Sequence, residues 1–331
     1  FSFTEAYPDF DIERVTAHGR AKGVQLIGHH ETGGNAFHYE QQLEPAMALY
    51  QRLGMHSVKT GYVADAGGAR VAGPDGRAVM AWHESQPMAQ HHMRVIETAA
   101  KHQVAVNAHE PFKDTGLRRT YPNMISREGA RGMEFSAWGQ PGNPPEHEAN
   151  LVFTRLLAGP MDYTPGIFGM ETRSPGGIQT TWAKQLALYV VIYSPIQMAA
   201  DLLVHYEANP APFQFIKDVP VDWAETKVLD GEIGDFVVIA RKDRHSDVWA
   251  LGAVSDEHPR SLSASLSFLD AGRRYRAEIY RDGPDADYRG KREDIVIEQR
   301  EVTSADTLTL NLAPGGGQAI RFVPLGRKSR R

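Results

Sequence analysis

The sequence predicts an α/β fold: a (β/α)8 TIM barrel, incomplete because its first strands are missing, followed by a C-terminal all-β sandwich domain. Three observations predict it. Helical stretches alternate with short apolar strands from residue 10 to about residue 205, polar residues follow several of these strands directly, and alternating strands dominate after about residue 222. Alternation of helix and strand is typical of parallel βα units. Polar residues at successive strand ends, without a GxGxxG loop, favour a barrel over a dinucleotide-binding fold.

The first two thirds of the chain supply the predicted barrel elements. We expect helices over 11–22, 39–53 and 87–102, and a glycine-rich insertion over 66–76. Strands are expected at 24–28, 57–63, 104–108, 132–136, 161–163 and 189–193. A closed barrel of this type has eight strands. The missing strands, and a chain that opens on Phe1 without an initiator methionine, predict a fragment or processed product that lacks the front of the barrel.

The last third of the chain has the pattern of a β domain. Apolar residues alternate with polar ones, as at Leu262, Ala264 and Leu266, and turn residues such as Asp282-Gly283-Pro284 separate the strands. The predicted strands are 235–240, 247–254, 261–268, 274–281, 307–312 and 318–323. We therefore expect two domains: part of a catalytic barrel over 1–222 and a C-terminal β-sandwich domain over 223–331.

Composition excludes several classes of function. The net charge is −5 with a pI near 6.3, which points to neither nucleic acid nor an anionic membrane, and the basic residues 327–331 read as a solvated tail. The chain contains no cysteine, so disulfides and thiolate zinc sites are excluded. No apolar run approaches the ~18 residues of a membrane span, so no membrane insertion is expected.

Four glutamates are the candidates for chemistry. Glu31 and Glu110 directly follow predicted strands, whereas Glu128 and Glu134 lie six residues apart with two glycines between them. On one α-helix that spacing would turn the two carboxylates about 240° apart, so they converge only if the glycines break the helix. Clustered carboxylates suit glycoside hydrolysis and also suit a hard cation such as Ca²⁺. For any one of the four, a solvated surface ion pair is the alternative.

Histidines and aromatic residues accompany these glutamates. His29, His30 and His109 lie beside the carboxylates, where a histidine either binds a metal or hydrogen-bonds substrate hydroxyls, and there is no HExxH helix. The pair His91-His92 is expected to be exposed or structural. Five aromatic residues follow predicted strands, where either sugar stacking or ordinary loop packing would place them: Trp82, Tyr121, Trp138, Tyr163 and Phe168.

Taken together, the motifs resemble family 97 of the glycoside hydrolases. The resemblance covers essentially the whole chain and rests on six segments: Gly28–Thr32, Val58–Tyr62, Val106–Glu110, Arg119–Asn123, Glu128–Glu134 and Gly159–Gly166. It implies an N-terminal β-sandwich domain, a central (β/α)8 barrel and a C-terminal β domain. The N-terminal domain would be missing from this chain, and it is expected to complete the site because it supplies a calcium-binding glutamate in the family.

The resemblance also implies a stereochemical course. Retaining members, which resemble α-galactosidases, place a nucleophilic aspartate where this chain has Gly61, two residues after Lys59. Without a carboxylate at that position the inverting route remains, and Asp65 is a nearby alternative nucleophile.

By similarity to the inverting α-glucosidases, each candidate acquires a role. Glu134 is implied as the general acid, and Glu31 and Glu110 as the pair that activates water. The same resemblance implies that Glu110, Glu128 and Glu134 bind Ca²⁺ and that His29 and His109 hold sugar hydroxyls.

The leading hypothesis is therefore a calcium-dependent, exo-acting α-glucosidase that hydrolyses α-glucosides or maltooligosaccharides with inversion. An α-galactosidase or another exo-α-glycosidase of the same family is one alternative, and an inactive carbohydrate-binding fragment is another. The family is mostly bacterial and exported, so the resemblance implies a periplasmic or exported protein with an oligosaccharide substrate.

Overall fold

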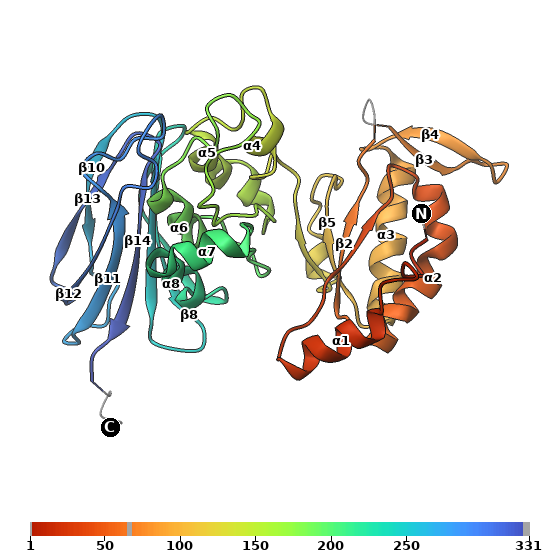
Figure 1. The fold of residues 1–331 in the computed structure, drawn as a ribbon, viewed down its shortest axis with the longest axis horizontal. Coiled ribbons are helices and arrows are strands. Elements are labelled where there is room, and N and C mark those ends of the chain that lie inside the picture. The colour runs from red at the N-terminus through yellow and green to blue at the C-terminus, as the bar shows by residue number, and fades with distance from the viewer. Residues whose placement is uncertain (1, 65–67, 327–331) are drawn as a thin grey trace. The chain divides into compact units, whose positions relative to one another are not determined.

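A computed structural model describes residues 2–64 and 68–326 of the chain. It divides into two compact units, residues 1–130 and residues 131–331, which run from red to yellow and from green to blue in Figure 1. Two features named in the sequence analysis lie outside the described residues: Asp65, the alternative nucleophile, and the basic tail 327–331. Within the described ranges, no helix has the length and apolar character needed to cross a membrane.

A four-stranded parallel sheet forms the centre of the first unit. Its strand order is β1-β2-β5-β6, with β1 at Gly28–Glu31, β2 at Ser57–Gly61, β5 at Ala105–Ala108 and β6 at Met124–Arg127. The unit also contains α1 (Ile12–Ala21), α2 (Ala36–Leu53), α3 (Gln86–Lys101), the antiparallel hairpin of β3 (Gly68–Ala72) and β4 (Ala78–Trp82), and a short 3-10 helix, η2 (Leu117–Arg119).

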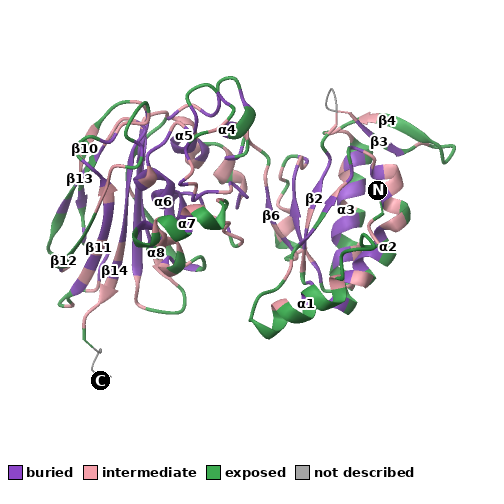
Figure 2. Cartoon of the chain, viewed as in Figure 1, coloured by how far each residue is buried: buried purple, intermediate pink, exposed green. Residues whose placement is uncertain are grey.

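Helices α2 and α3 cover one face of this sheet. Asn35 caps α2 by accepting a hydrogen bond from the His38 N–H, and Gly54 ends it in the left-handed conformation with φ 68°. Apolar residues of both helices share a core with Val58 and Val106, whose side chains point to the helical side of the sheet. Figure 2 shows these inward faces of α2 and α3 as buried. The opposite face of the sheet is therefore the one that displays its polar residues.

The second unit combines short helices with a β-sandwich. A six-stranded sheet of order β12-β11-β14-β9-β8-β7 packs against the two-stranded sheet β10-β13, and Leu251, Leu310 and Phe322 lie in the core between them. The strands are β7 (Trp223–Glu232), β8 (Phe236–Asp243), β9 (Trp249–Ser255), β10 (Arg260–Ser265), β11 (Tyr275–Asp282), β12 (Ile295–Val302), β13 (Thr307–Leu312) and β14 (Gly317–Pro324). The helices are α4 (Phe135–Trp138), α5 (His147–Phe153), η3 (Arg155–Ala158), α6 (Trp182–Val191), α7 (Leu203–Ala208) and α8 (Pro210–Asp218).

Helix α6 corrects the strand expected at 189–193. Thr181 caps it by accepting from the Lys184 N–H, and the helix is buried on nearly all sides because it packs against β9 and β14. The helix approaches closely at Gly252, where an added Cβ would lie 2.7 Å from the Ala187 carbonyl oxygen. A short, continuous apolar run looks the same in sequence whether it forms a buried strand or a buried helix.

Other strand predictions were displaced or wrong. The strand expected at 24–28 begins at Gly28, where pairing with Val58 starts, and Val24 is 57% exposed. Residues 132–136 and 161–163 are not in strands, although the Met133 N–H donates to the Tyr163 carbonyl and the Met161 N–H to the Tyr193 carbonyl.

Five strands were missed altogether: β3, β4, β6, β7 and β12. The hairpin of β3 and β4 lies at and just after the stretch expected to be a glycine-rich insertion. Strand β6 contains two buried polar residues, Ser126 and Arg127, so it lacks the apolar run that predicts a buried strand. Strands β7 and β12 are the outer strands of the six-stranded sheet and are mostly exposed, so they lack the apolar alternation that marks a half-buried strand. The division into a barrel part over 1–222 and a β domain over 223–331 stays a prediction.

Candidate active site

The register of the parallel sheet places most candidate residues in one row. Glu31, the last residue of β1, lies opposite Gly61, the last residue of β2. One residue before Gly61, Thr60 pairs with Ala108 at the end of β5, and Ala108 pairs with Arg127 at the end of β6. One step further along, His109 follows β5 and Glu128 follows β6. The carboxyl ends of all four strands therefore carry candidates at one edge of the sheet. The sequence predicted this placement for Glu31 and Glu110 but not for Glu128, because β6 was not predicted.

A second row lies two residues earlier on the same face. His29 pairs with Lys59, Lys59 with Asn107, and Asn107 with Ser126. Side chains two residues apart on a strand share a face, so these residues lie on the same side of the sheet as Glu31. Sequence reasoning gave no role to Lys59 or Asn107; the signal that would have found them is their even spacing from Gly61 and His109.

Backbone N–H groups hold the two glutamates of the predicted base pair. Glu31 Oε1 accepts from the Gly33 N–H at 2.8 Å and from the Val63 N–H at 3.2 Å. Glu110 Oε2 accepts from the Tyr62 N–H at 2.7 Å. Adjacent residues at the end of β2 thus bind both carboxylates. Glu110 itself has φ 42°, a left-handed conformation that is unfavourable for a residue with a Cβ.

Position 61 must be a glycine for Glu31 to keep its place. A Cβ added at Gly61 would lie 2.0 Å from Glu31 Oε2 and 3.2 Å from His29 Nε2. His29 Nε2 in turn lies 3.7 Å from Glu31 Oε2. The space beside β2 that a side chain at position 61 would need is therefore filled by the Glu31 carboxylate.

Glu128 and His109 form the other end of the row. His109 is buried, with its Nδ1 3.6 Å from Glu128 Oε2, and the side chain of Glu128 is 19% exposed. The Glu128 N–H donates to the Ala108 carbonyl, which continues the strand pairing of β6. Gly129, with φ 64°, then turns the chain away.

Glu134 belongs to the second unit. It caps the short helix α4 with φ −52° and is exposed, and the neighbouring Met133 N–H donates to the Tyr163 carbonyl. No helix connects it to Glu128, so the condition that the sequence set for convergence of the two carboxylates is met. Glu31, Glu110 and Glu128 are thus brought to one edge of the first unit, whereas the convergence of Glu134 with them stays a prediction.

The remaining candidates divide by burial. Tyr163 and Phe168 are buried and belong to the packing of the second unit, while Trp82 and Trp138 are 60% and 59% exposed. Trp82 ends the β3–β4 hairpin, opposite Gly68. His30 is buried on the helical side, where it bonds the Tyr39 hydroxyl at 2.8 Å. Burial, reinforced by His29, lowers the pKa of His30 to about 3, so it is neutral and structural.

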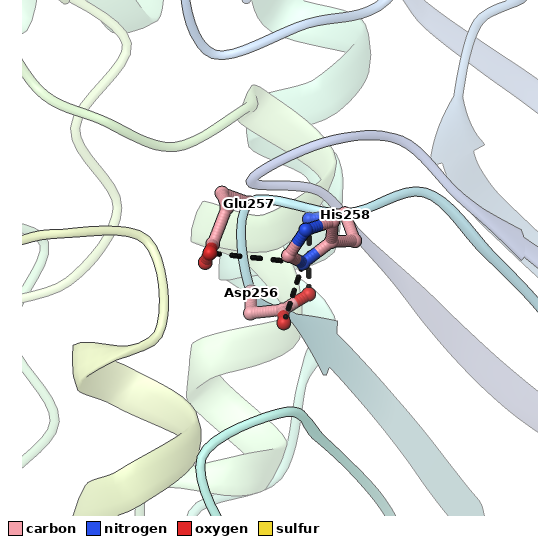
Figure 3. Close-up of side chains that lie close together, drawn as sticks. All are labelled: Asp256, Glu257 and His258. Carbon is pink, nitrogen blue, oxygen red and sulfur yellow. Dashed lines mark hydrogen bonds and ion pairs between the residues drawn. The ribbon is translucent and has the colours of Figure 1, made fainter.

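Among the described residues, one group of three potential metal ligands has its donor atoms close together, and it lies in the β domain. Asp256, Glu257 and His258 follow β9 and bring their donor atoms within 4.8 Å of one another (Figure 3). Asp256 accepts from the His258 N–H at 3.0 Å and pairs with Arg260 at 2.8 Å. Arg260 offsets the Asp256 charge, and the bond to the His258 N–H closes the turn between β9 and β10. We therefore interpret Asp256, Glu257 and His258 as structural.

Known proteins support one family for both ends of the chain. The family Glycoside hydrolase 97 matches residues 1–130, and a second family, described as glycosyl-hydrolase 97 C-terminal, oligomerisation, matches residues 222–323. The fold agrees with structures of a glycoside hydrolase family 97 enzyme from Pseudoalteromonas sp. strain K8, in complex with panose and with acarbose. These are 54% identical, with a TM-score of 0.95 over 98% of this chain and 50% of theirs. The chain belongs to glycoside hydrolase family 97.

More distant relatives carry specific activities in their names. A retaining α-galactosidase of Bacteroides thetaiotaomicron is 30% identical over 95% of this chain and 45% of its own length. A β-arabinopyranosidase structure is 22% identical with a TM-score of 0.72, over 94% of this chain and 48% of its own, and shows the shared fold. The chain spans about half the length of the relatives it matches.

Proposed function

We propose that this chain is the larger part of the catalytic machinery of an exo-acting, calcium-dependent α-glucosidase that hydrolyses α-glucosides or maltooligosaccharides with inversion. Family membership supports glycoside hydrolysis as the reaction. Two features of the first unit support the finer assignment: the row of carboxylates at the carboxyl edge of its parallel sheet, and the glycine at position 61.

The observation that carries inversion is the contact between Gly61 and Glu31. A retaining enzyme needs a carboxylate that attacks the sugar and forms a covalent intermediate. At the end of β2 an aspartate cannot replace Gly61 while Glu31 keeps its place, because even a Cβ would lie 2.0 Å from Glu31 Oε2. Glu31 and Glu110 are instead held side by side by successive N–H groups, an arrangement suited to a shared water molecule.

The proposed reaction is a single displacement. Glu134 gives its proton to the glycosidic oxygen as the bond from that oxygen to the anomeric carbon breaks. Glu31 and Glu110 take a proton from the water that forms the new bond to the opposite face of the anomeric carbon. The anomeric configuration is inverted and the first product is β-glucose. His29 and His109, beside these carboxylates, hold sugar hydroxyls.

The chemistry of the donors supports a hard cation, because carboxylate oxygens are ligands that it prefers. Glu110 and Glu128 supply carboxylate oxygens at the ends of neighbouring strands, and because the Tyr62 N–H uses Oε2 of Glu110, Oε1 can serve as a ligand. We assign Glu110, Glu128 and Glu134 to calcium. The bound ion would offset the mutual repulsion of these carboxylates and polarise the site.

The wider context belongs to the same proposal. The four parallel strands of the first unit would be part of a (β/α)8 barrel, to which the hydrogen-bonded segments around Met133, Met161 and Tyr193 also contribute. A β-sandwich domain on the amino-terminal side would complete the site, and the protein would be periplasmic or exported. The exposed indole of Trp82 offers a surface on which a sugar ring can stack.

A second candidate function is an α-galactosidase, which the names of the more distant relatives favour. The relative that binds panose and acarbose is more similar to this chain, and panose is a trisaccharide of α-linked glucose. Retention would also need a nucleophile other than residue 61. We therefore rank the inverting α-glucosidase first.

The experiment that tests the proposal is a proton NMR time course of an activated α-glucoside with calcium, beside the matching α-galactoside. Initial β-glucose would support inversion, with Glu31 and Glu110 as the base pair. Initial α-glucose would contradict it and make Asp65 the first residue to substitute. Faster hydrolysis of the galactoside would favour the second candidate. If the chain alone gives no product but an amino-terminally extended chain does, the missing domain is required; if neither does, the chain is an inactive carbohydrate-binding protein.

A further inference from the structure

The end of β2 is the point on which both proposed base residues depend. The Tyr62 N–H binds Glu110 Oε2 at 2.7 Å, and the next N–H, that of Val63, binds Glu31 Oε1 at 3.2 Å. These two residues have left the strand ladder, which ends at Gly61. Their position therefore sets the spacing between the carboxylates, and something other than strand pairing must fix it.

The Tyr62 side chain supplies that anchor. It is fully buried, and its ring meets His91 and His92 of α3 edge-on, with centroids 5.2 and 4.9 Å away. Its hydroxyl lies 2.9 Å from His91 Nε2. The Val63 side chain, in contrast, is 62% exposed. The segment is thus held from the helical side of the sheet, through residue 62.

His91 is held in turn by Glu40, whose ion pair with Arg94 joins two helices. Its Nδ1 lies 2.6 Å from Glu40 Oε1 on α2, and that same oxygen accepts from Arg94 Nη2 at 2.6 Å. Burial would raise the pKa of Glu40, but the hydrogen bonds from His91 and Arg94 outweigh it and leave that pKa below its usual value. Glu40 is therefore an ionised acceptor.

The chemistry of the three groups allows one direction for each bond. Burial lowers the pKa of His91, even though Glu40 opposes the shift, so the imidazole is neutral at pH 7. Nδ1–H then donates to the Glu40 carboxylate, which leaves Nε2 as an acceptor for the Tyr62 O–H. Each donor of this chain faces an acceptor, so the Tyr62 hydroxyl is held in one position, against His91 Nε2.

We propose that Tyr62 and His91 are positioning residues for the reaction: the buried chain Glu40–His91–Tyr62 fixes the backbone that holds Glu110 and Glu31 at their working separation. Neither residue would touch the substrate. This inference rests on the proposed function only in treating those two carboxylates as the catalytic base.

The test uses Tyr62→Phe, His91→Leu and the double variant, assayed on the glycoside that the wild-type protein hydrolyses fastest. We expect kcat to fall about tenfold in each single variant, with KM changed less than about twofold, because the reacting geometry loosens while sugar contacts remain. The double variant should be no slower than His91→Leu, since both substitutions break the same bond.

Tyr189→Phe is the matched control. Tyr189 of α6 is also buried, and its hydroxyl donates to the Met198 carbonyl at 2.7 Å. Neither residue is a candidate site residue, and both belong to the second unit. The variant should lower the melting temperature about as much as Tyr62→Phe and leave kcat within about twofold of the wild type.

Several outcomes would overturn the inference: an unchanged kcat in Tyr62→Phe, equal losses in Tyr189→Phe and Tyr62→Phe, or additive losses in the double variant. A wild-type protein that hydrolyses no glycoside would contradict the proposed function instead. In that case the crystal structure of Tyr62→Phe still decides: a bond from the residue 62 N–H to Glu110 that lengthens beyond 3.5 Å supports the positioning role, and an unchanged bond refutes it.

Discussion

At the scale of single residues, position 61 decides which chemistry the row of carboxylates can perform. Glu31 and Gly61 are direct neighbours across β1 and β2. Because Gly61 has no side chain, the Glu31 carboxylate can occupy the space beside it. Sequence reasoning identified Gly61 as the place where a nucleophile is lacking. It could not show that Glu31 fills that place, because the contact depends on the register of two strands.

Gly61→Ala tests this dependence. The new methyl group would displace Glu31 Oε2, and misplacing a catalytic group by about 1 Å can cost on the order of 100-fold in rate. We expect a loss of that size in kcat, with the melting temperature nearly unchanged, measured by initial rates and thermal unfolding. Gly290→Ala is the control, because nothing lies within 4 Å of a Cβ added there. Similar activities of the two variants would show that Glu31 does not need its present place.

Glu134→Gln tests the general acid. Glu134 is exposed in its own unit, so the substitution should leave the fold intact. Hydrolysis of maltooligosaccharides should fall by roughly 10²–10⁴-fold, whereas an α-glucoside with a strongly acidic leaving group should lose much less, because that group departs without a proton. Equal losses on the two substrates would contradict the role, and near-normal activity on both would remove Glu134 from the mechanism.

At the scale of elements, the sequence predicted the elements with clear periodicity and failed at those set by tertiary context. Helices α2 and α3 carry apolar residues at helical spacing and formed within a few residues of the expected bounds. Helix α6 is buried on nearly all sides, and β7 and β12 are mostly exposed outer strands. Neither kind of element therefore shows the alternation of apolar and polar residues that identifies a half-buried element in the sequence. The candidates followed the same rule: residues directly after predicted strands were nominated, and the row containing Lys59 was not.

Asp282 gives the junction between α6 and the β-sandwich a pH dependence. Its buried carboxylate accepts from the Thr181 hydroxyl and from the Ala313 and Gly317 N–H groups, yet burial raises its pKa to about 6. Between about pH 4 and pH 6 the folded chain holds more protons on this group than the unfolded chain does. The free energy of unfolding therefore falls as the pH rises, by up to about 3 kcal/mol.

Asp282→Asn should remove that slope. Urea midpoints measured at pH 4.5 and pH 7 should differ less in the variant than in the wild type, because an amide does not titrate in this range. Asp285→Asn is a suitable control, since Asp285 is exposed and its pKa is held low by Lys291, so the wild-type slope should persist. A slope in Asp282→Asn as steep as that of the wild type would place the titrating group elsewhere.

At the scale of the whole molecule, the proposed calcium ligands are distributed along the chain. Glu110 and Glu128 end strands β5 and β6 of the first unit, and Glu134 caps α4 of the second. The sequence could nominate these residues, because each stands in a segment of the family pattern. It could not test their convergence, because that depends on how the two units are placed relative to each other.

Metal removal tests this assignment. Dialysis against a chelator should lower both the activity and the melting temperature, since an ion that binds only the folded state stabilises it by mass action. Added calcium should restore both, and magnesium should restore less because it demands a tighter octahedral site. Glu128→Gln should need more calcium for half-maximal activity and recover partly when calcium is in excess. If the rates and the melting temperature of the wild type respond to neither chelator nor calcium, the three carboxylates do not form a metal site, and the repulsion among them must be relieved by protonation or by His109, whose Nδ1 already lies 3.6 Å from Glu128.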